Sequence, residues 1–184
     1  MHRGRIAFAG AMMLAGCTAT ADPPSPDRVA TPVPLYFVRE GMVNAINPPT
    51  EEIWAMQVEV MDDAGNFDPA LFQPGQWDAL AAAALRLDEA AHVMAAACAY
   101  ASHDPDGELG SAPDGTDLVA IEARLRANPQ AFNAYAVALA NHTLQLREAV
   151  AARDPAWITR MVNDLQPTCK ACHDAFWYPE EYAR

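Results

Sequence analysis

The amino-acid sequence predicts an all-α fold, an antiparallel up-down-up-down four-helix bundle. The composition is rich in alanine, with many leucine, methionine, arginine and glutamate residues, which favour helices, and with few β-branched runs. Four segments carry apolar side chains at alternating steps of three and four residues, the spacing of helices that pack at shallow angles. Segments rich in proline, glycine and aspartate separate these four apolar stripes.

The first residues are expected to direct export and not to join the fold. Arg3 and Arg5 precede an apolar run over residues 6–14, which is typical of a signal peptide and too short to span a bilayer. The run ends in Leu-Ala-Gly-Cys, which resembles the bacterial lipoprotein signal, whose cysteine receives lipid. We therefore expect residues 1–16 to be removed and Cys17 to anchor the chain on the periplasmic side of a bacterial membrane. The alternative is an ordinary secretory signal in which Cys17 has no role.

Residues 17–34 are expected to be a stiff tether. They contain five prolines and few bulky apolar side chains, so they cannot bury enough surface to fold alone. The remaining chain, residues 35–184, is long enough for one domain and is expected to form the bundle.

The first bundle helix is expected over residues 35–60, where one apolar stripe runs from Leu35 to Val60. Within it, the adjacent Pro48 and Pro49 must break or kink the helix, because proline lacks the backbone N–H and clashes with the preceding turn.

The other bundle helices are expected over residues 77–98, 132–146 and 158–176, with a short extra helix over 117–126. In the last of them, Pro167 is expected to kink or restart the helix. Breaks are expected at Pro74-Gly75, over residues 104–115 and at Asp154-Pro155.

The most informative motif lies in the last helix, where Cys169, Cys172 and His173 form a Cys-x-x-Cys-His pentapeptide. In an exported protein this motif is the attachment signature of c-type haem, with two thioether bonds and one iron ligand. The three side chains share one helix face, so all three can point toward one flat cofactor. We therefore expect covalent haem c, with iron, at this position.

Three other interpretations of the motif are weaker. A zinc site needs two further ligands, yet Cys17 and Cys98 are isolated in the sequence. A thioredoxin-like redox pair belongs in an alternating β/α chain, which the sequence does not predict. A plain disulfide between the motif cysteines leaves the adjacent histidine unexplained.

The predicted topology places the haem at one end of the bundle, near the end of the last helix. His173 lies about 19 residues, about 29 Å at 1.5 Å per residue, from the turn that precedes this helix. Residues at the same level of the other helices are the predicted pocket. They are Met42 on the first helix, His92, Met94 and Cys98 on the second, and Tyr135 and Phe132 on the third, with Phe176 beside the motif.

Two methionines are candidates for the sixth iron ligand. Met42 and Met94 both lie on apolar stripes near the predicted haem level, and a His/Met ligand pair raises the reduction potential of haem iron. A methionine on such a stripe can equally be packing, as can Cys98. Met42 is the first candidate and Met94 the runner-up, while His142 lies nearer the far end and is expected to be a satisfied core or semi-buried histidine.

The position of the motif on the last of four helices resembles the class II c-type cytochromes, the cytochrome c′-like group. The similarity covers about residues 35–184, and its specific motif is Cys169 to His173. The resemblance implies that His173 is the proximal iron ligand and that Cys169 and Cys172 carry the thioethers. Met42 is the best counterpart of the group's early methionine, although Arg39 precedes it by three residues where the group often has a spacing of four.

This resemblance implies two functions. In one branch of the group a methionine ligates the iron and the protein transfers electrons, and in the other the iron is open to gases such as nitric oxide. We expect an electron carrier without a substrate, and a gas-binding protein is the alternative. A haem peroxidase would need a polar distal His/Arg pair, for which only His92 and Arg39 are roughly placed. A structural lipoprotein without haem is the remaining interpretation.

The charge of the chain bears on its partners. The formal net charge is −12, and removal of the signal takes away two arginines and no acidic residue. Such a surface disfavours nucleic acid as a partner. We expect a redox partner protein with a basic docking face and a membrane reached through the lipid anchor, with a second copy of the chain as a further option. Acidity that serves solubility alone explains the charge equally well.

Overall fold

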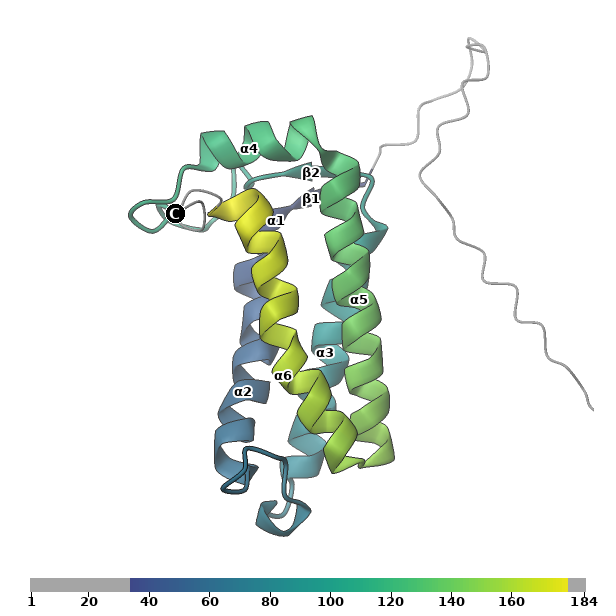
Figure 1. Cartoon of the computed structure of the whole chain (residues 1–184). Helices are drawn as coiled ribbons and strands as arrows, with labels where there is room; N and C mark the ends of the chain where they lie inside the picture. The colour runs from purple at the N-terminus through teal and green to yellow at the C-terminus, as the bar shows by residue number, and fades with distance from the viewer. Residues whose placement is uncertain (1–33, 179–184) are drawn as a thin grey trace, which may run out of the picture. The chain divides into compact units, whose positions relative to one another are not determined.

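The computed structural model describes residues 34–178 and confirms the predicted all-α bundle. The helices form four long rods. Figure 1 shows these rods lying side by side, with successive rods running in opposite directions. The first rod joins α1, a π-helical turn η1 and α2, and the fourth joins α6 to a second π-helical turn, η3. The elements of the rods are α1 (Val38–Gly41), η1 (Met42–Ile46), α2 (Asn47–Val60), α3 (Gln76–Ala96), α5 (Pro129–Ala152), α6 (Pro155–Cys172) and η3 (His173–Trp177).

The core lies along the axis of the bundle, where the predicted apolar stripes meet. Ile53 of α2, Leu87 of α3 and Leu146 of α5 have no exposed surface, and neither does Leu165 of α6. Each long helix thus buries one stripe against its neighbours. Burial of such side chains stabilises the fold by about 1.5–3 kcal/mol each.

A small parallel sheet, which the sequence analysis missed, ties the start of the first rod to the end of the second. Strand β1 (Leu35–Phe37) pairs with β2 (Ala99–Ala101), and Tyr36 lies opposite Tyr100. The predicted helix over 35–60 is therefore wrong in its first residues. The aromatic residues Tyr36 and Phe37 favour a strand, and successive side chains of a strand point to opposite faces, so that Tyr36 is turned inward while Leu35 is 51 % exposed.

The end of α3 also differs from the prediction. The helix ends at Ala96, and the N–H groups of Cys98 and Ala99 donate to the carbonyl oxygen of Pro34. The expectation of a buried Cys98 on the helical stripe is therefore wrong, since Cys98 is exposed beyond the helix end.

The proline pair in the first rod does not break it. Pro48 and Pro49 lie in the first turn of α2, and the chain continues directly from η1 into α2. Just before them the backbone N–H of Asn47 donates to the carbonyl of Met42, five residues back. The prolines therefore change the hydrogen-bond pattern of the rod, and the helix continues through them. Pro167 is likewise accommodated inside α6, which neither ends nor restarts there.

The remaining boundaries follow the predicted breaks. Gly75, with a φ of 87°, precedes α3, and the side chain of Asp154 accepts from the N–H of Trp157 at 3.0 Å at the start of α6. The predicted short helix is α4 (Leu118–Ala127), capped by Asp117, and a 3₁₀ turn, η2 (Pro69–Leu71), lies in the loop before α3.

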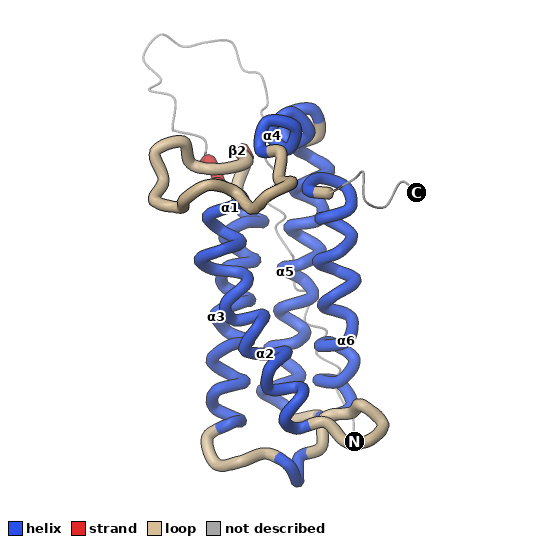
Figure 2. The backbone as a smooth tube through the Cα atoms, turned by 90° about the vertical axis from the view of Figure 1, so that its left-hand side faces the viewer, coloured by secondary structure: helices blue, strands red, loops and turns tan. Residues whose placement is uncertain are grey.

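Figure 2 shows α4 and the β2 end of the sheet at one end of the bundle, across the ends of the rods. Among residues 34–178, no helix combines the length and the apolar character that a membrane crossing requires. The predicted signal segment 1–16, the anchor Cys17 and almost all of the tether lie outside the described residues.

Candidate functional site

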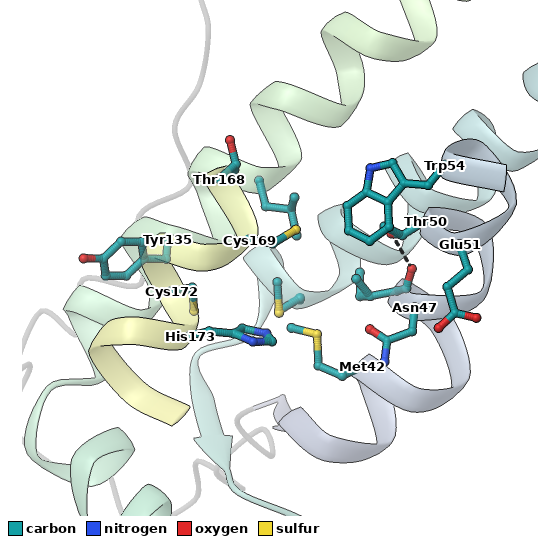
Figure 3. Close-up of a pocket in the computed structure, with 13 residues that line it drawn as sticks. Met42, Asn47, Thr50, Glu51, Trp54, Tyr135, Thr168, Cys169, Cys172 and His173 are labelled. Carbon is teal, nitrogen blue, oxygen red and sulfur yellow. Dashed lines mark hydrogen bonds between the residues drawn. The ribbon is translucent and has the colours of Figure 1, made fainter. Parts of the chain in front are cut away.

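The three motif residues lie where α6 ends and η3 begins. Cys169 and Cys172 occupy the last turn of α6, and His173 starts the π-helical turn that follows. All three side chains are half-buried, and both cysteines are free thiols. Figure 3 shows them on one face of the helix, directed toward α2 across a pocket.

Two adjacent cavities occupy this end of the bundle. The first, of about 250 Å³, lies between α6, α2, α3 and α5. Its lining is Met42, Ile46, Asn47, Thr50, Glu51, Trp54, Met94, Tyr135, Leu139, Thr168, Cys169, Cys172 and His173.

The second cavity, of about 180 Å³, lies under the loop that precedes α4. It is lined by Val38, Arg39, Met42, Val43, Asn47, Pro113, Thr116, Phe132, Cys172, His173, Phe176, Trp177 and Tyr178. Four residues line both cavities: Met42, Asn47, Cys172 and His173. The two cavities therefore meet at the motif histidine and at the predicted sixth ligand.

The structure brings most of the predicted pocket residues to these cavities. Met94 and Tyr135 line the first cavity, and Phe132 and Phe176 line the second. Met42 lines both, and Figure 3 shows its side chain pointing toward the ring of His173. Met94 is 2 % exposed and contacts the first cavity alone.

Two residues placed at this level by the sequence analysis do not reach the cavities. The side chain of His92 is 52 % exposed and lies 3.1 Å from a carboxylate oxygen of Asp88, on a different face of α3 from Met94. Cys98 lies beyond the end of α3. The distal His/Arg pair considered for a peroxidase is therefore not present: Arg39 lines the second cavity without His92.

His142 is a semi-buried histidine with a hydrogen-bond partner, which is one of the two expected forms. Its Nε2 donates to the carbonyl of Met161 at 2.7 Å, which joins α5 to α6 away from both cavities.

Asn47 and Tyr178 line the cavities although the sequence analysis did not single them out. Each lies five residues after a candidate iron ligand and closes a π-helical turn: the N–H of Asn47 donates to Met42, and that of Tyr178 donates to His173 at 2.8 Å. A regular α-helix would turn residue i+5 away from residue i, so the usual helical period conceals both residues.

Aromatic rings form the wall of the second cavity. Phe132 and Phe176 meet edge to face with centroids 5.2 Å apart, and Tyr135 meets Phe176 at 6.1 Å. The ring of Tyr178 lies edge-on to His173 at 6.2 Å. These rings give the motif histidine an apolar, aromatic neighbourhood on one side.

The surroundings hold the motif residues in their neutral forms. Burial raises the pKa of Cys169 to about 11 and that of Cys172 to about 12, the latter also through its proximity to Cys169. Burial lowers the pKa of His173, partly offset by the carboxylate of Asp174. A neutral imidazole is the form that binds a metal.

Two hydrogen bonds hold the loop over the second cavity. The guanidinium of Arg39 donates to the carbonyl of Ser111 at 3.0 Å, and the carboxylate of Glu40 accepts from the N–H of Asp104 at 3.1 Å. The loop residues Pro113 and Thr116 then complete the cavity lining. The start of the first rod therefore carries Met42 and also fixes the loop that covers the second cavity.

The donor set fits a covalently bound haem. Two thiols and one imidazole face a largely apolar pocket from one helix face, and a thioether faces the imidazole from the opposite wall. Thioethers and imidazoles are axial ligands of haem iron, and cysteine thiols are its covalent attachment points.

A family model described as Cytochrome C' matches residues 72–177 of the chain. The matched range covers more than half of the 184 residues and includes α3, α5, α6 and the whole motif, but not Met42 or Asn47. Comparisons with curated proteins and with solved structures give no match.

Proposed function

The chain belongs to the cytochrome c′ family, whose members carry covalently attached, iron-containing haem c, and we propose that it acts as a one-electron carrier. Family membership makes it a c-type haem cytochrome, and such proteins are typically periplasmic. The proposal adds that this cytochrome converts no substrate. When bound, the haem supplies a one-electron couple of its iron.

We assign the attachment roles to the motif. Cys169 and Cys172 provide the two thioether links, and His173 provides the proximal ligand. The support is their common face at the end of α6 and the neutral imidazole that burial favours.

Met42 is the proposed sixth ligand, and one observation carries this choice. Met42 and His173 line both cavities and face one another, whereas Met94 lines only the first. A thioether in the sixth position raises the reduction potential and occupies the site that a small gas would need. Both effects favour electron transfer over ligand binding.

The surrounding residues support a carrier in a further way. The aromatic wall gives the site an apolar side, and the half-buried Cys169 and Cys172 keep one side of the pocket near the surface. An electron carrier needs both an apolar centre and a short path to its partner.

The location and partners are part of the same proposal. We place the chain on the periplasmic side of a bacterial membrane, anchored through lipid at Cys17. Its acidic surface is suited to a redox partner with a basic docking face, since opposite charges speed encounter between proteins.

One observation favours the alternative function, binding of nitric oxide or another small gas. Met42 is only partly buried, so its thioether can leave the sixth position without opening the fully buried core.

The experiment that separates the two functions is the visible spectrum of the haem-loaded protein beside that of Met42→Ala. We expect low-spin spectra in both oxidation states and no response to nitric oxide, and we expect Met42→Ala to become high-spin and to bind the gas. A wild-type spectrum that is high-spin and shifts with nitric oxide would establish the gas-binding alternative. An unchanged spectrum in Met42→Ala would transfer the ligand assignment to Met94 or to an open site.

A further inference from the structure

A π-helical turn directly before the proline pair determines which residue lies beside Met42. In a regular α-helix the carbonyls of Asn44 and Ala45 would accept from the residues four positions later, but these are Pro48 and Pro49, which have no N–H. Directly before the prolines the structure has the π-helical turn Met42–Ile46, in which Asn47 donates its N–H to Met42. One extra residue is thereby inserted into the helical register just before the prolines.

This register brings two side chains together that a regular helix would separate. At about 100° per residue, residues five apart in an α-helix point about 140° away from one another. In a π turn the i+5 residue lies about one turn above residue i. Asn47 therefore shares the face of Met42, and both line both cavities. Figure 3 shows the two side chains on the same side of the pocket.

Asn47 also has a hydrogen-bond donor to spare. Its carboxamide makes no hydrogen bond to any residue between 34 and 178, and it can present two N–H groups to the pocket. The neighbouring polar residue Thr50 is already engaged, since its hydroxyl donates to the carbonyl of Ile46 at 2.8 Å. Asn47 thus lines both cavities beside Met42 and keeps both carboxamide N–H groups free of partners among the described residues, so it can act on the thioether.

We infer that Asn47 is a positioning residue for the sixth iron ligand: in the haem-loaded protein its carboxamide, which has no hydrogen-bond partner among residues 34–178 of this structure, donates a hydrogen bond to the sulfur of Met42 and holds the thioether toward His173. The inference rests on the proposed ligation by Met42. Partners of this kind orient metal ligands and set how tightly they bind. The π turn is the backbone feature that places Asn47 beside Met42.

The test compares two asparagines on one turn. Both asparagines are exposed, but only Asn47 lines the cavities: Asn47→Leu removes a carboxamide at the pocket, whereas Asn44→Leu makes the same change at a position that lines neither cavity. The probe is imidazole, titrated into the ferric, haem-loaded protein, because it must displace the sixth ligand to bind.

We expect Asn47→Leu to bind imidazole about fivefold more tightly than wild type, the factor that a hydrogen bond of typical strength gives. We also expect the ¹³C-labelled methyl resonance of Met42 to shift. Asn44→Leu should match wild type, and Asn47→Gln, which keeps the carboxamide, should recover most of the difference.

Equal imidazole affinity in Asn47→Leu and Asn44→Leu would overturn the inference. Met42→Ala, titrated in the same series, separates ligation by Met42 from the positioning role of Asn47. If Met42→Ala binds imidazole much more tightly while Asn47→Leu does not, the ligation stands and the role of Asn47 is wrong. If Met42→Ala leaves the affinity unchanged, the ligation itself is wrong, and the role of Asn47 is wrong with it.

Discussion

At Gly41, the last residue of α1, the helix has no room for a side chain. A β-carbon built there would lie 1.9 Å from the hydroxyl oxygen of Tyr36 and 2.3 Å from its ring. This close approach lets β1 pack directly over the residue before Met42. A glycine in a helix normally costs about 1 kcal/mol relative to alanine, so here the contact outweighs helical preference.

We therefore expect Gly41→Ala to lower the free energy of unfolding by about 1–3 kcal/mol, because overpacking displaces Tyr36. Denaturation of the haem-loaded protein in urea measures the change. Gly110→Ala is the matched control, because a β-carbon at Gly110 meets no atom within 4 Å. A Gly41→Ala variant as stable as this control would show that the contact does not exist in solution.

The hydroxyl of Tyr36 has a second consequence, which depends on pH. It is buried without a hydrogen-bond partner among the described residues, and burial, aided by Tyr100, raises the pKa of Tyr36 to about 12. The folded state therefore favours the neutral phenol. Its contribution to stability is fully present below the unfolded pKa of about 10 and is lost as the pH rises toward 12.

Tyr36→Phe should consequently lose less stability than wild type between pH 10 and pH 12. At pH 7 we expect it to be as stable as wild type or slightly more stable, because the buried oxygen has no partner to lose. Urea denaturation at pH 7, 10 and 12 tests both points. Parallel pH profiles for the two proteins would mean that Tyr36 does not titrate differently on folding.

Among the elements, the pairing of α3 with α5 includes one buried charge. Asp88 of α3 is 3 % exposed, and its carboxylate accepts from Arg147 of α5 at 2.5 Å and from the hydroxyl of Thr143 at 3.3 Å. Nδ1 of His92, one turn further along α3, lies 3.1 Å from the same carboxylate. The charge is thus satisfied from both helices, on a different face of α3 from Met94.

We expect Arg147→Met to destabilise the protein by about 1.5–3 kcal/mol, because the carboxylate of Asp88 keeps its burial and loses its main partner. The same substitution at Arg86, whose ion pair with Glu52 is about half exposed on both sides, should cost less than about 1 kcal/mol. Thermal or urea unfolding of the two variants gives the comparison. Equal costs would contradict the structural role of Asp88.

The sequence predicts the long helices and most of the pocket for one physical reason. A regular helix rises by the same amount at every residue, so Phe132, Tyr135 and Met94 could be placed beside His173 by counting along the chain. That reasoning fails wherever the hydrogen-bond register changes. Asn47 and Tyr178 were missed because each closes a π turn, and Cys98 was misplaced because α3 ends two residues before it.

The strands were missed for a different reason. Leu35–Phe37 and Ala99–Ala101 are three residues each, too short for a period of two to stand out from the helical stripes beside them. They pair across more than sixty residues of sequence, so the contact of Tyr36 with Tyr100 has no local signal.

The proline pair was recognised as a disturbance of the first helix. Whether the helix would break there could not be predicted, because the sequence does not show that a π turn precedes the prolines and lets the rod continue.

In the domain as a whole, most irregular elements gather at one end of a regular bundle. The sheet, α4 and both π turns lie at the end that holds the cavities, whereas the opposite end carries the loop with the 3₁₀ turn η2 and the turn between α5 and α6 (Figure 1). The regular rods supply stability, and the irregular end supplies the pocket and its cover. This division explains why the fold was easier to predict than the site.

The central claim is that haem is covalently attached through Cys169 and Cys172. The most direct measurement is the mass of the chain produced together with haem-attachment machinery, compared with the Cys169→Ala, Cys172→Ala variant. We predict a mass increased by one haem in the wild type and by none in the variant. An unmodified wild-type mass, with both motif thiols open to alkylation, would contradict it.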